Sequence, residues 1–110
     1  MDKEFCDIYD LLYGLGISAN YTGFFQTVCA VELCRADPTR LQLVTKQVYP
    51  EVARRCKTSW IAVERNIRTV CAIAWKNNRH LLEQLGRRPF PQRPHNAQFL
   101  AILLYSLPIC

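Results

Sequence analysis

Apolar residues recur at helical spacing along most of this 110-residue chain, and strand-like alternation is hard to find. The pattern predicts helices over about residues 3–13, 23–34 and 41–49, a short helix that begins at Pro50, a long helix capped by Thr58 or Ser59, and a last, almost wholly apolar helix that ends near Leu107. We therefore expect an all-α fold, a compact bundle of about six helices that forms a single domain over residues 1–110.

The long helix is the most informative element because its two sides differ. One side collects apolar residues, namely Trp60, Val63, Ile67, Val70, Cys71 and Ala74. The other side carries cationic and small residues, namely Arg65, Arg68, Thr69, Ala72 and Lys76. A helix that is apolar behind and cationic in front is suited to lie in a DNA groove. Trp60 and Trp75, at the two ends of this segment, are expected in the core.

The segment after the long helix is punctuated by helix breakers. The helix should fray near Asn77 and Asn78, with a further turn or two before Gly86. Residues 86–94 hold three prolines and three arginines and should form an extended surface loop. This loop fits either a basic wing that reaches DNA or a stiff connector that happens to be basic. Asn96 should cap the last helix, which is either sandwiched in the core or partly used at an interface.

The short helix from Pro50 and the long helix after it form a candidate helix-turn-helix. On this hypothesis the base-reading residues are Glu64, Arg65, Arg68 and Thr69, because Arg pairs with guanine and Glu accepts from cytosine. The candidate phosphate contacts are Lys46, Arg54, Arg55, Lys57, Thr58, Ser59, Lys76 and Arg79. Plainer interpretations stay open: Glu64 pairing with Arg68 at i,i+4, ordinary capping by the hydroxyl residues, and solvated surface cations.

Charge is concentrated in the middle of the chain. Residues 35–93 hold 13 of the 14 Lys and Arg against four acidic residues, a net charge of +9, whereas residues 1–34 are net acidic by four charges. A basic middle within one domain indicates a positive face that suits a polyanion such as double-stranded DNA.

The residues that commonly carry catalysis or hold metals do not form a site. We find no nucleophile–base pair, Gly-rich phosphate loop or paired carboxylates, so we expect no enzyme, no cofactor and no small-molecule substrate. His80 and His95 stand alone and cannot complete a zinc site with the cysteines, so no metal is expected. The six cysteines contain no Cys-x-x-Cys pair; they are Cys6, Cys29, Cys34, Cys56, Cys71 and Cys110.

The ends of the chain indicate neither export nor membrane insertion. The first ten residues are mostly charged or polar, unlike a signal peptide. The longest apolar run, residues 99–109, is shorter than the roughly 20 residues needed to span a bilayer. We therefore expect a cytoplasmic protein with reduced thiols and no membrane partner.

Three blocks of the sequence are similar to one known family. They are residues 43–56 (Leu-Val-Thr-Lys-Gln-Val-Tyr-Pro-Glu-Val-Ala-Arg-Arg-Cys), residues 63–68 (Val-Glu-Arg-Asn-Ile-Arg) followed by Ala74-Trp75, and residues 94–100 (Pro-His-Asn-Ala-Gln-Phe-Leu). These blocks resemble the C-terminal DNA-binding effector domain of the sporulation stage-zero A response regulator, a bacterial transcription regulator. The resemblance covers nearly the whole chain.

The resemblance implies a six-helix fold with an embedded helix-turn-helix that binds short GC-containing sites as tandem dimers. It implies that Glu64, Arg65 and Arg68 occupy base-reading and phosphate-contacting positions. It also implies that the last helix contributes dimer contacts, here through Phe99 and Leu103. The expected partners are double-stranded DNA and a second copy of the chain.

The chain departs from the family pattern in two respects. The family protein carries an N-terminal receiver domain, whereas Met1 directly precedes the first effector helix, so we expect an excised fragment or a stand-alone product. Ile61-Ala62 stands where the family often has Ser-Arg, and Thr69 where it often has His. A second hypothesis is therefore a receiver-less interaction module that pairs with a full-length response regulator through its last helix.

Overall fold

The computed structural model describes the backbone of residues 3–108 and the side chains of residues 7–108, and this part of the chain contains no β-strand. Its elements are α1 (Lys3–Gly14), α2 (Thr22–Ala36), the 3-10 helix η1 (Pro38–Leu43), α3 (Val44–Gln47), α4 (Tyr49–Cys56), α5 (Trp60–Gly86) and α6 (Asn96–Tyr105). The predicted all-α class and the number of about six helices are confirmed.

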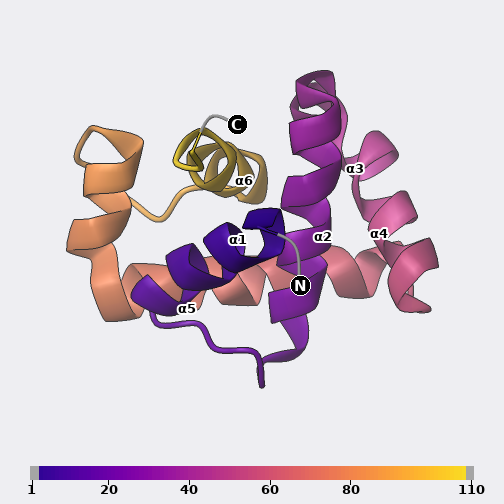
Figure 1. The fold of residues 1–110 in the computed structure, drawn as a ribbon, viewed down its shortest axis with the longest axis horizontal. Coiled ribbons are helices and arrows are strands. Elements are labelled where there is room, and N and C mark those ends of the chain that lie inside the picture. The colour runs from indigo at the N-terminus through magenta and orange to yellow at the C-terminus, as the bar shows by residue number, and fades with distance from the viewer. Residues whose placement is uncertain (1–2, 109–110) are drawn as a thin grey trace.

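Helix α5 is the element on which the others assemble (Figure 1). Helices α2, α4 and α6 all pack against it, and α2 also packs against α6. The side chains with no exposed surface between these helices include Phe24 of α2, Ile67 and Leu82 of α5, and Phe99 of α6. One continuous apolar core therefore holds α5 from several sides and leaves one side of it exposed.

The contact between α2 and α5 depends on a glycine. A Cβ atom at Gly23 would lie 2.6 Å from the carbonyl oxygen of Asn66 and 2.7 Å from a methyl carbon of Val70. The backbones approach so closely here that a larger residue has no room. Beside this contact the side-chain amide of Asn66 donates to the side-chain oxygen of Gln26 at 3.1 Å, which satisfies two polar groups at the helix interface.

Asn78 bends α5 at the place where the sequence predicts fraying. Its backbone leaves the helical region, with φ −151° and ψ 60°. Its side-chain oxygen accepts from the backbone N–H of Leu81 at 3.2 Å, and its side-chain nitrogen donates to the carbonyl of Gly14 at 3.0 Å. Asn78 therefore caps the last turns of α5 and ties them to the end of α1, and Figure 1 shows these turns directed away from the main axis of α5.

Three details of the predicted helices and loops differ in the structure. The expected helix over residues 41–49 is divided, because the 3-10 helix starts at Pro38 with Asp37 as its cap and Tyr49 already belongs to α4. Asn96 does not cap α6: His95 holds that position, and Asn96 is the first helical residue. Residues 86–94 are not purely a surface loop, because Phe90 is buried.

Phe90 is fastened to the end of α5 by its backbone. Its N–H donates to a carboxylate oxygen of Glu83 at 2.7 Å, and its carbonyl accepts from Arg79 at 2.5 Å. The N–H of Phe90 and the guanidinium of Arg79 lower the pKa of Glu83. These bonds make the loop stiff near Phe90; they do not involve the side chains of its arginines, so both interpretations of the loop stay open.

The two tryptophans of α5 differ from each other. Trp75 is partly buried against the core, and the guanidinium of Arg79 lies 4.1 Å from its ring centre. Trp60 is 46% exposed, so its assignment to the core is wrong. It is the first residue of α5, directly after the turn from α4.

Candidate functional site

The cationic side of α5 is exposed over most of its length. The side chains of Arg65, Arg68, Thr69 and Lys76 are exposed and that of Ala72 is half-buried; we call these five residues the α5 stripe. The opposite side is buried in the core and consists of Val63, Ile67, Val70, Cys71 and Ala74. The predicted division of residues 63–76 into a buried apolar side and an exposed cationic side is therefore confirmed. The prediction succeeds because the period of a helix fixes the side on which each residue lies.

Two open hollows flank the α5 stripe. One has a volume of about 760 Å³ and lies between α5, the start of α4 and residues 92–97, with Glu64, Arg68 and Arg93 on its walls. The other, of about 490 Å³, is bordered by Arg68, Thr69, Lys76 and again Arg93. Both are surface grooves beside a convex helix, and Arg93 borders both of them.

Arg93 belongs to the loop that the sequence interprets as a basic wing or a stiff connector, but the sequence does not single it out as a contact. It is 25 positions away from Arg68, and no local pattern indicates that the two residues lie side by side. The structure places its exposed side chain beside Arg68 and Lys76. Three cations from two segments therefore border one hollow, which is an arrangement that attracts an anionic partner.

Glu64 and Arg68 form the i,i+4 ion pair that their spacing predicts. A guanidinium nitrogen of Arg68 lies 3.6 Å from a carboxylate oxygen of Glu64, with side chains 51% and 33% exposed. Such an exposed pair contributes little to stability, about 0.3–0.5 kcal/mol on a helix, but it restrains the direction of Arg68. Among the ion pairs of the described residues, the one on this face involves Arg68 and not Arg65.

Asn96 joins the three helices that surround the larger groove. Its side-chain nitrogen donates to the backbone carbonyl of Glu64 at 3.0 Å and lies 3.2 Å from the hydroxyl of Tyr49. Burial raises the pKa of Tyr49, so the hydroxyl is uncharged at neutral pH. Because one amide contacts both α4 and α5, it sets the position of the α5 stripe relative to α4.

A short turn connects α4 to α5. Lys57 ends α4 in the left-handed region, with φ 55° and ψ 50°, which glycine adopts more easily than lysine. The side chain of Ser59 accepts from the backbone N–H of Ala62 at 3.1 Å, so Ser59 is the helix cap. The N–H of Thr58 donates to the carbonyl of Ala53 at 2.9 Å. Lys57, Thr58 and Ser59 are all exposed at the turn.

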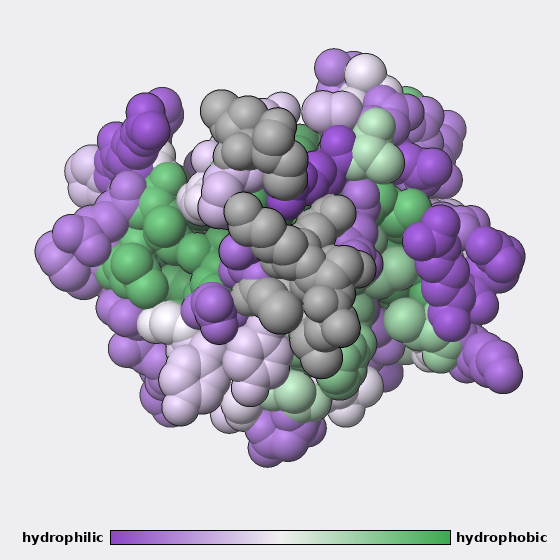
Figure 2. All heavy atoms as spheres, in the orientation of Figure 1, coloured by the Kyte–Doolittle hydropathy of each residue, from purple (hydrophilic) through white to green (hydrophobic). Residues whose placement is uncertain are grey.

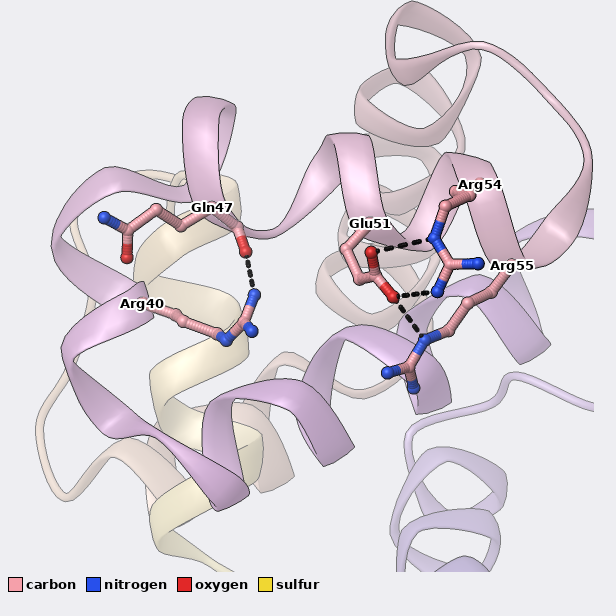
Figure 3. Close-up of polar contacts among 5 residues, drawn as sticks. All are labelled: Arg40, Gln47, Glu51, Arg54 and Arg55. Carbon is pink, nitrogen blue, oxygen red and sulfur yellow. Dashed lines mark hydrogen bonds and ion pairs between the residues drawn. The ribbon is translucent and has the colours of Figure 1, made fainter.

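Two of the candidate phosphate contacts share one carboxylate on α4 (Figure 3). Arg54 donates to both oxygens of Glu51, at 3.0 and 2.5 Å, and Arg55 donates to one of them at 2.8 Å. We call Glu51, Arg54 and Arg55 the Glu51 cluster. These hydrogen bonds, first from Arg54 and then from Arg55, lower the pKa of Glu51 to about 2. The carboxylate is therefore charged at neutral pH, and the cluster has a net charge of only +1.

The remaining candidate cations fall into two groups. Lys46 and Lys76 are exposed, and Lys46 shares a hollow of about 500 Å³ with Arg54 and Arg40. Arg79 is different, because it already contacts Trp75, Glu83 and the carbonyl of Phe90. We therefore assign Arg79 a structural role instead of the expected phosphate contact.

The expected dimer contacts are not on the surface. Phe99 and Leu103 have no exposed area, because both point from α6 into the core. The expectation that these two side chains touch a second copy is therefore wrong for this conformation. Any partner of α6 must contact its outer side, where Gln98 is exposed and Tyr105 is 71% exposed.

The described residues contain no group of three His, Cys, Asp or Glu placed to bind a metal ion. Within the same part of the chain, no helix is both long and apolar enough to cross a membrane.

The four cysteines whose side chains the structure describes form no disulfide; they are Cys29, Cys34, Cys56 and Cys71. Burial raises the pKa of Cys34 and of Cys71 to about 11. Cys6 and Cys110 lie outside the described side chains.

Comparison with models of known families matches residues 8–107 to the family described as the sporulation initiation factor Spo0A C terminal. The matched range begins within α1 and ends beyond α6. It therefore includes the α5 stripe, the Glu51 cluster, Arg93 and Asn96, and it covers most of the chain.

Proposed function

The chain belongs to the Spo0A C-terminal family, a family of DNA-binding effector domains of sporulation regulators, and we propose that it is a sequence-specific transcriptional regulator with α4 and α5 as its helix-turn-helix. The observation that carries the proposal is the α5 stripe, a row of exposed cations and small side chains on a helix whose other side is buried. The family is regulatory and not catalytic, which agrees with the expected lack of enzyme activity.

In this proposal α5 lies in the major groove and the stripe reads base edges. Arg65 and Arg68 present guanidinium groups from neighbouring turns, and each can bond the O6 and N7 atoms of a guanine. Glu64 orients Arg68 through their ion pair and can also accept from the amino group of a cytosine. Thr69, next to Arg68, offers a methyl group and a hydroxyl oxygen that can accept a hydrogen bond, because its hydroxyl already donates to the backbone carbonyl of Arg65 at 3.1 Å.

The phosphate contacts flank α5 in this proposal. Lys46 and the Glu51 cluster lie on the α3–α4 side, and Lys57, Thr58 and Ser59 lie at the turn that leads into α5. Lys76 lies further along the stripe, and we add Arg93, which borders both grooves. Such contacts fix the position of the protein on the duplex without reading its sequence.

We further propose that residues 1–110 act as one domain and bind tandem sites as a homodimer. Packing of α2, α4 and α6 on one helix supports a single unit. Because Phe99 and Leu103 are buried, the dimer contact is assigned to the outer side of α6, near Gln98 and Tyr105.

The decisive experiment is in vitro selection of duplexes from a random library, followed by affinity measurements at two salt concentrations. Arg65→Ala should lose about 1–3 kcal/mol on the selected site and relax its preference at one position. Arg88→Ala is the matched control, because this arginine is also exposed but lies in the loop after α5. Equal affinity of the wild type for selected and random duplexes would refute the proposed function.

One observation favours a second candidate function, an interaction module that pairs with a full-length response regulator. A hollow of about 530 Å³ lies between the end of α5 and α6, with Leu85, Ile102 and Tyr105 on its walls. Figure 2 shows apolar surface in this region. Co-purification without DNA separates the two functions: a stable mixed complex supports the module, and a monomer or self-dimer that binds selected duplexes supports the regulator.

A further inference from the structure

We infer that Ile61 reads the C5-methyl group of a thymine next to the bases contacted by Arg65, and thereby sets part of the sequence preference. This inference rests on the proposed function, in which α5 lies in the major groove. It adds a large apolar contact to a face otherwise made of cations and small side chains.

The position of Ile61 carries the argument, because an exposed apolar side chain alone is common on protein surfaces. Ile61 is the second residue of α5 and is 59% exposed. At about 100° per residue, it lies within about 60° of Arg65, Arg68 and Ala72 around the helix. It therefore extends the α5 stripe by one turn toward the start of the helix.

Distances along the helix place Ile61 within reach of neighbouring base pairs. At about 1.5 Å per residue, it precedes Arg65 by roughly 6 Å and Arg68 by roughly 10 Å. Bases on one strand are separated by about 3.4 Å, so these offsets correspond to about two and three base steps. The first residues of a recognition helix are also those that approach base edges in helix-turn-helix proteins.

The apolar side chain of Ile61 is suited to contact one group in the major groove, the methyl group of thymine. Isoleucine has no hydrogen-bonding group, and the thymine methyl is the apolar group that a standard base pair presents in the major groove. Because isoleucine is β-branched, it keeps essentially one χ1 rotamer in a helix, and its methyl groups are held in place before binding. Trp60 is exposed at the same end but lies about 100° away around the helix, so we assign it no base.

The test compares thymine with uracil, which differ only in the C5-methyl group. The probe is the duplex selected by the wild type, with each dT replaced singly by dU. At one position near the guanine read by Arg65, the replacement should weaken wild-type binding about fourfold. This factor is the loss of affinity expected when one buried methyl group is removed from the interface. Ile61→Ser should bind the dT and dU duplexes equally, whereas Ile61→Val should keep most of the discrimination.

Tyr13→Ser serves as the control, because Tyr13 is 65% exposed but lies on α1, away from the stripe; it should discriminate like the wild type. Circular dichroism of Ile61→Ser should show unchanged helix content. Wild-type binding that ignores every dU, or an Ile61→Ser variant that still discriminates, would overturn the inference and leave the proposed function standing. A wild type without any sequence preference would overturn both.

Discussion

The side-chain amide of Asn96 donates a hydrogen bond to the backbone carbonyl of Glu64 at 3.0 Å, so the first residue of α6 holds the second turn of α5. The same nitrogen reaches the hydroxyl of Tyr49, the first residue of α4. These residues are 32 and 47 positions away from Asn96. One amide therefore joins both members of the α4–α5 pair to the last helix, and one of its partners is the backbone of Glu64, whose side chain pairs with Arg68.

Asn96→Ala should destabilise the fold, because it removes both hydrogen bonds and leaves the Tyr49 hydroxyl without this partner. At about 0.5–1.5 kcal/mol per bond, the free energy of unfolding should fall by about 1–3 kcal/mol, as measured by urea denaturation. Gln98→Ala, an exposed change two residues further along α6, should stay within about 0.5 kcal/mol of the wild type. Equal stability of the two variants would contradict the role assigned to Asn96.

Gly23→Ala should destabilise the protein although alanine is the better helix former. The new methyl group would meet the carbonyl of Asn66 at 2.6 Å, so α2 and α5 must move apart. Overpacking of this kind costs about 1–3 kcal/mol, measurable by denaturation. Gly14→Ala is the control, because its Cβ would meet only a side-chain carbon of Leu81 at 3.4 Å. A Gly23→Ala protein as stable as the control would show that the helices are not in close contact.

Glu51→Gln should strengthen binding to random-sequence DNA. The variant removes the negative charge that Arg54 and Arg55 share, so both guanidinium groups become available to phosphates. The slope of log affinity against log salt should steepen by up to about 0.9 for each added phosphate contact, measured by fluorescence anisotropy between low and moderate salt. Asp10→Asn, which removes the same charge from an exposed position on α1, should leave the slope unchanged. A shallower slope for Glu51→Gln would argue against phosphate contacts by the Glu51 cluster.

The bond between Glu83 and Phe90 should make stability depend on pH. The pKa of Glu83 is lowered in the folded state, so its contribution is present above the unfolded value of 4.5 and is lost as the pH falls through the lower folded value. At pH 7 Glu83→Gln should therefore have a lower Tm than the wild type, and the gap should close in acid. Gln84→Ala, in the same turn, should show a gap that does not change with pH. A Tm difference between Glu83→Gln and the wild type that stays the same at every pH would contradict a stabilising role of the charged Glu83 carboxylate.

Much of the fold could be predicted from local pattern. Helical period assigned Val63, Ile67 and Val70 to the core and Arg65 and Arg68 to the surface, because the repeat of a helix is a property of neighbouring residues. The same reasoning failed for Trp60, which follows the apolar period but lies at the exposed start of α5. Burial at a helix end depends on what covers it, and periodicity does not contain that information.

Other features required contacts between distant segments. Asn96 has the residue type of a helix cap, but its partners on α4 and α5 give it a different role. Phe90 lies among prolines and arginines that predict a surface loop, yet Glu83 and Arg79 hold it against the protein. Arg93 borders the same hollow as Arg68, although the two residues are 25 positions apart in the sequence.

The sequence by itself determined the helical class, the two faces of α5 and the cations available to a polyanion, since these follow from composition and from a repeat of about 3.6 residues. The tertiary structure decided which of those cations are paired with Glu51 or Glu83, which are exposed on α5, and which apolar residues of α6 are buried. The reason is physical: hydrogen bonds and close packing between helices depend on side chains that are far apart along the chain and meet only after folding.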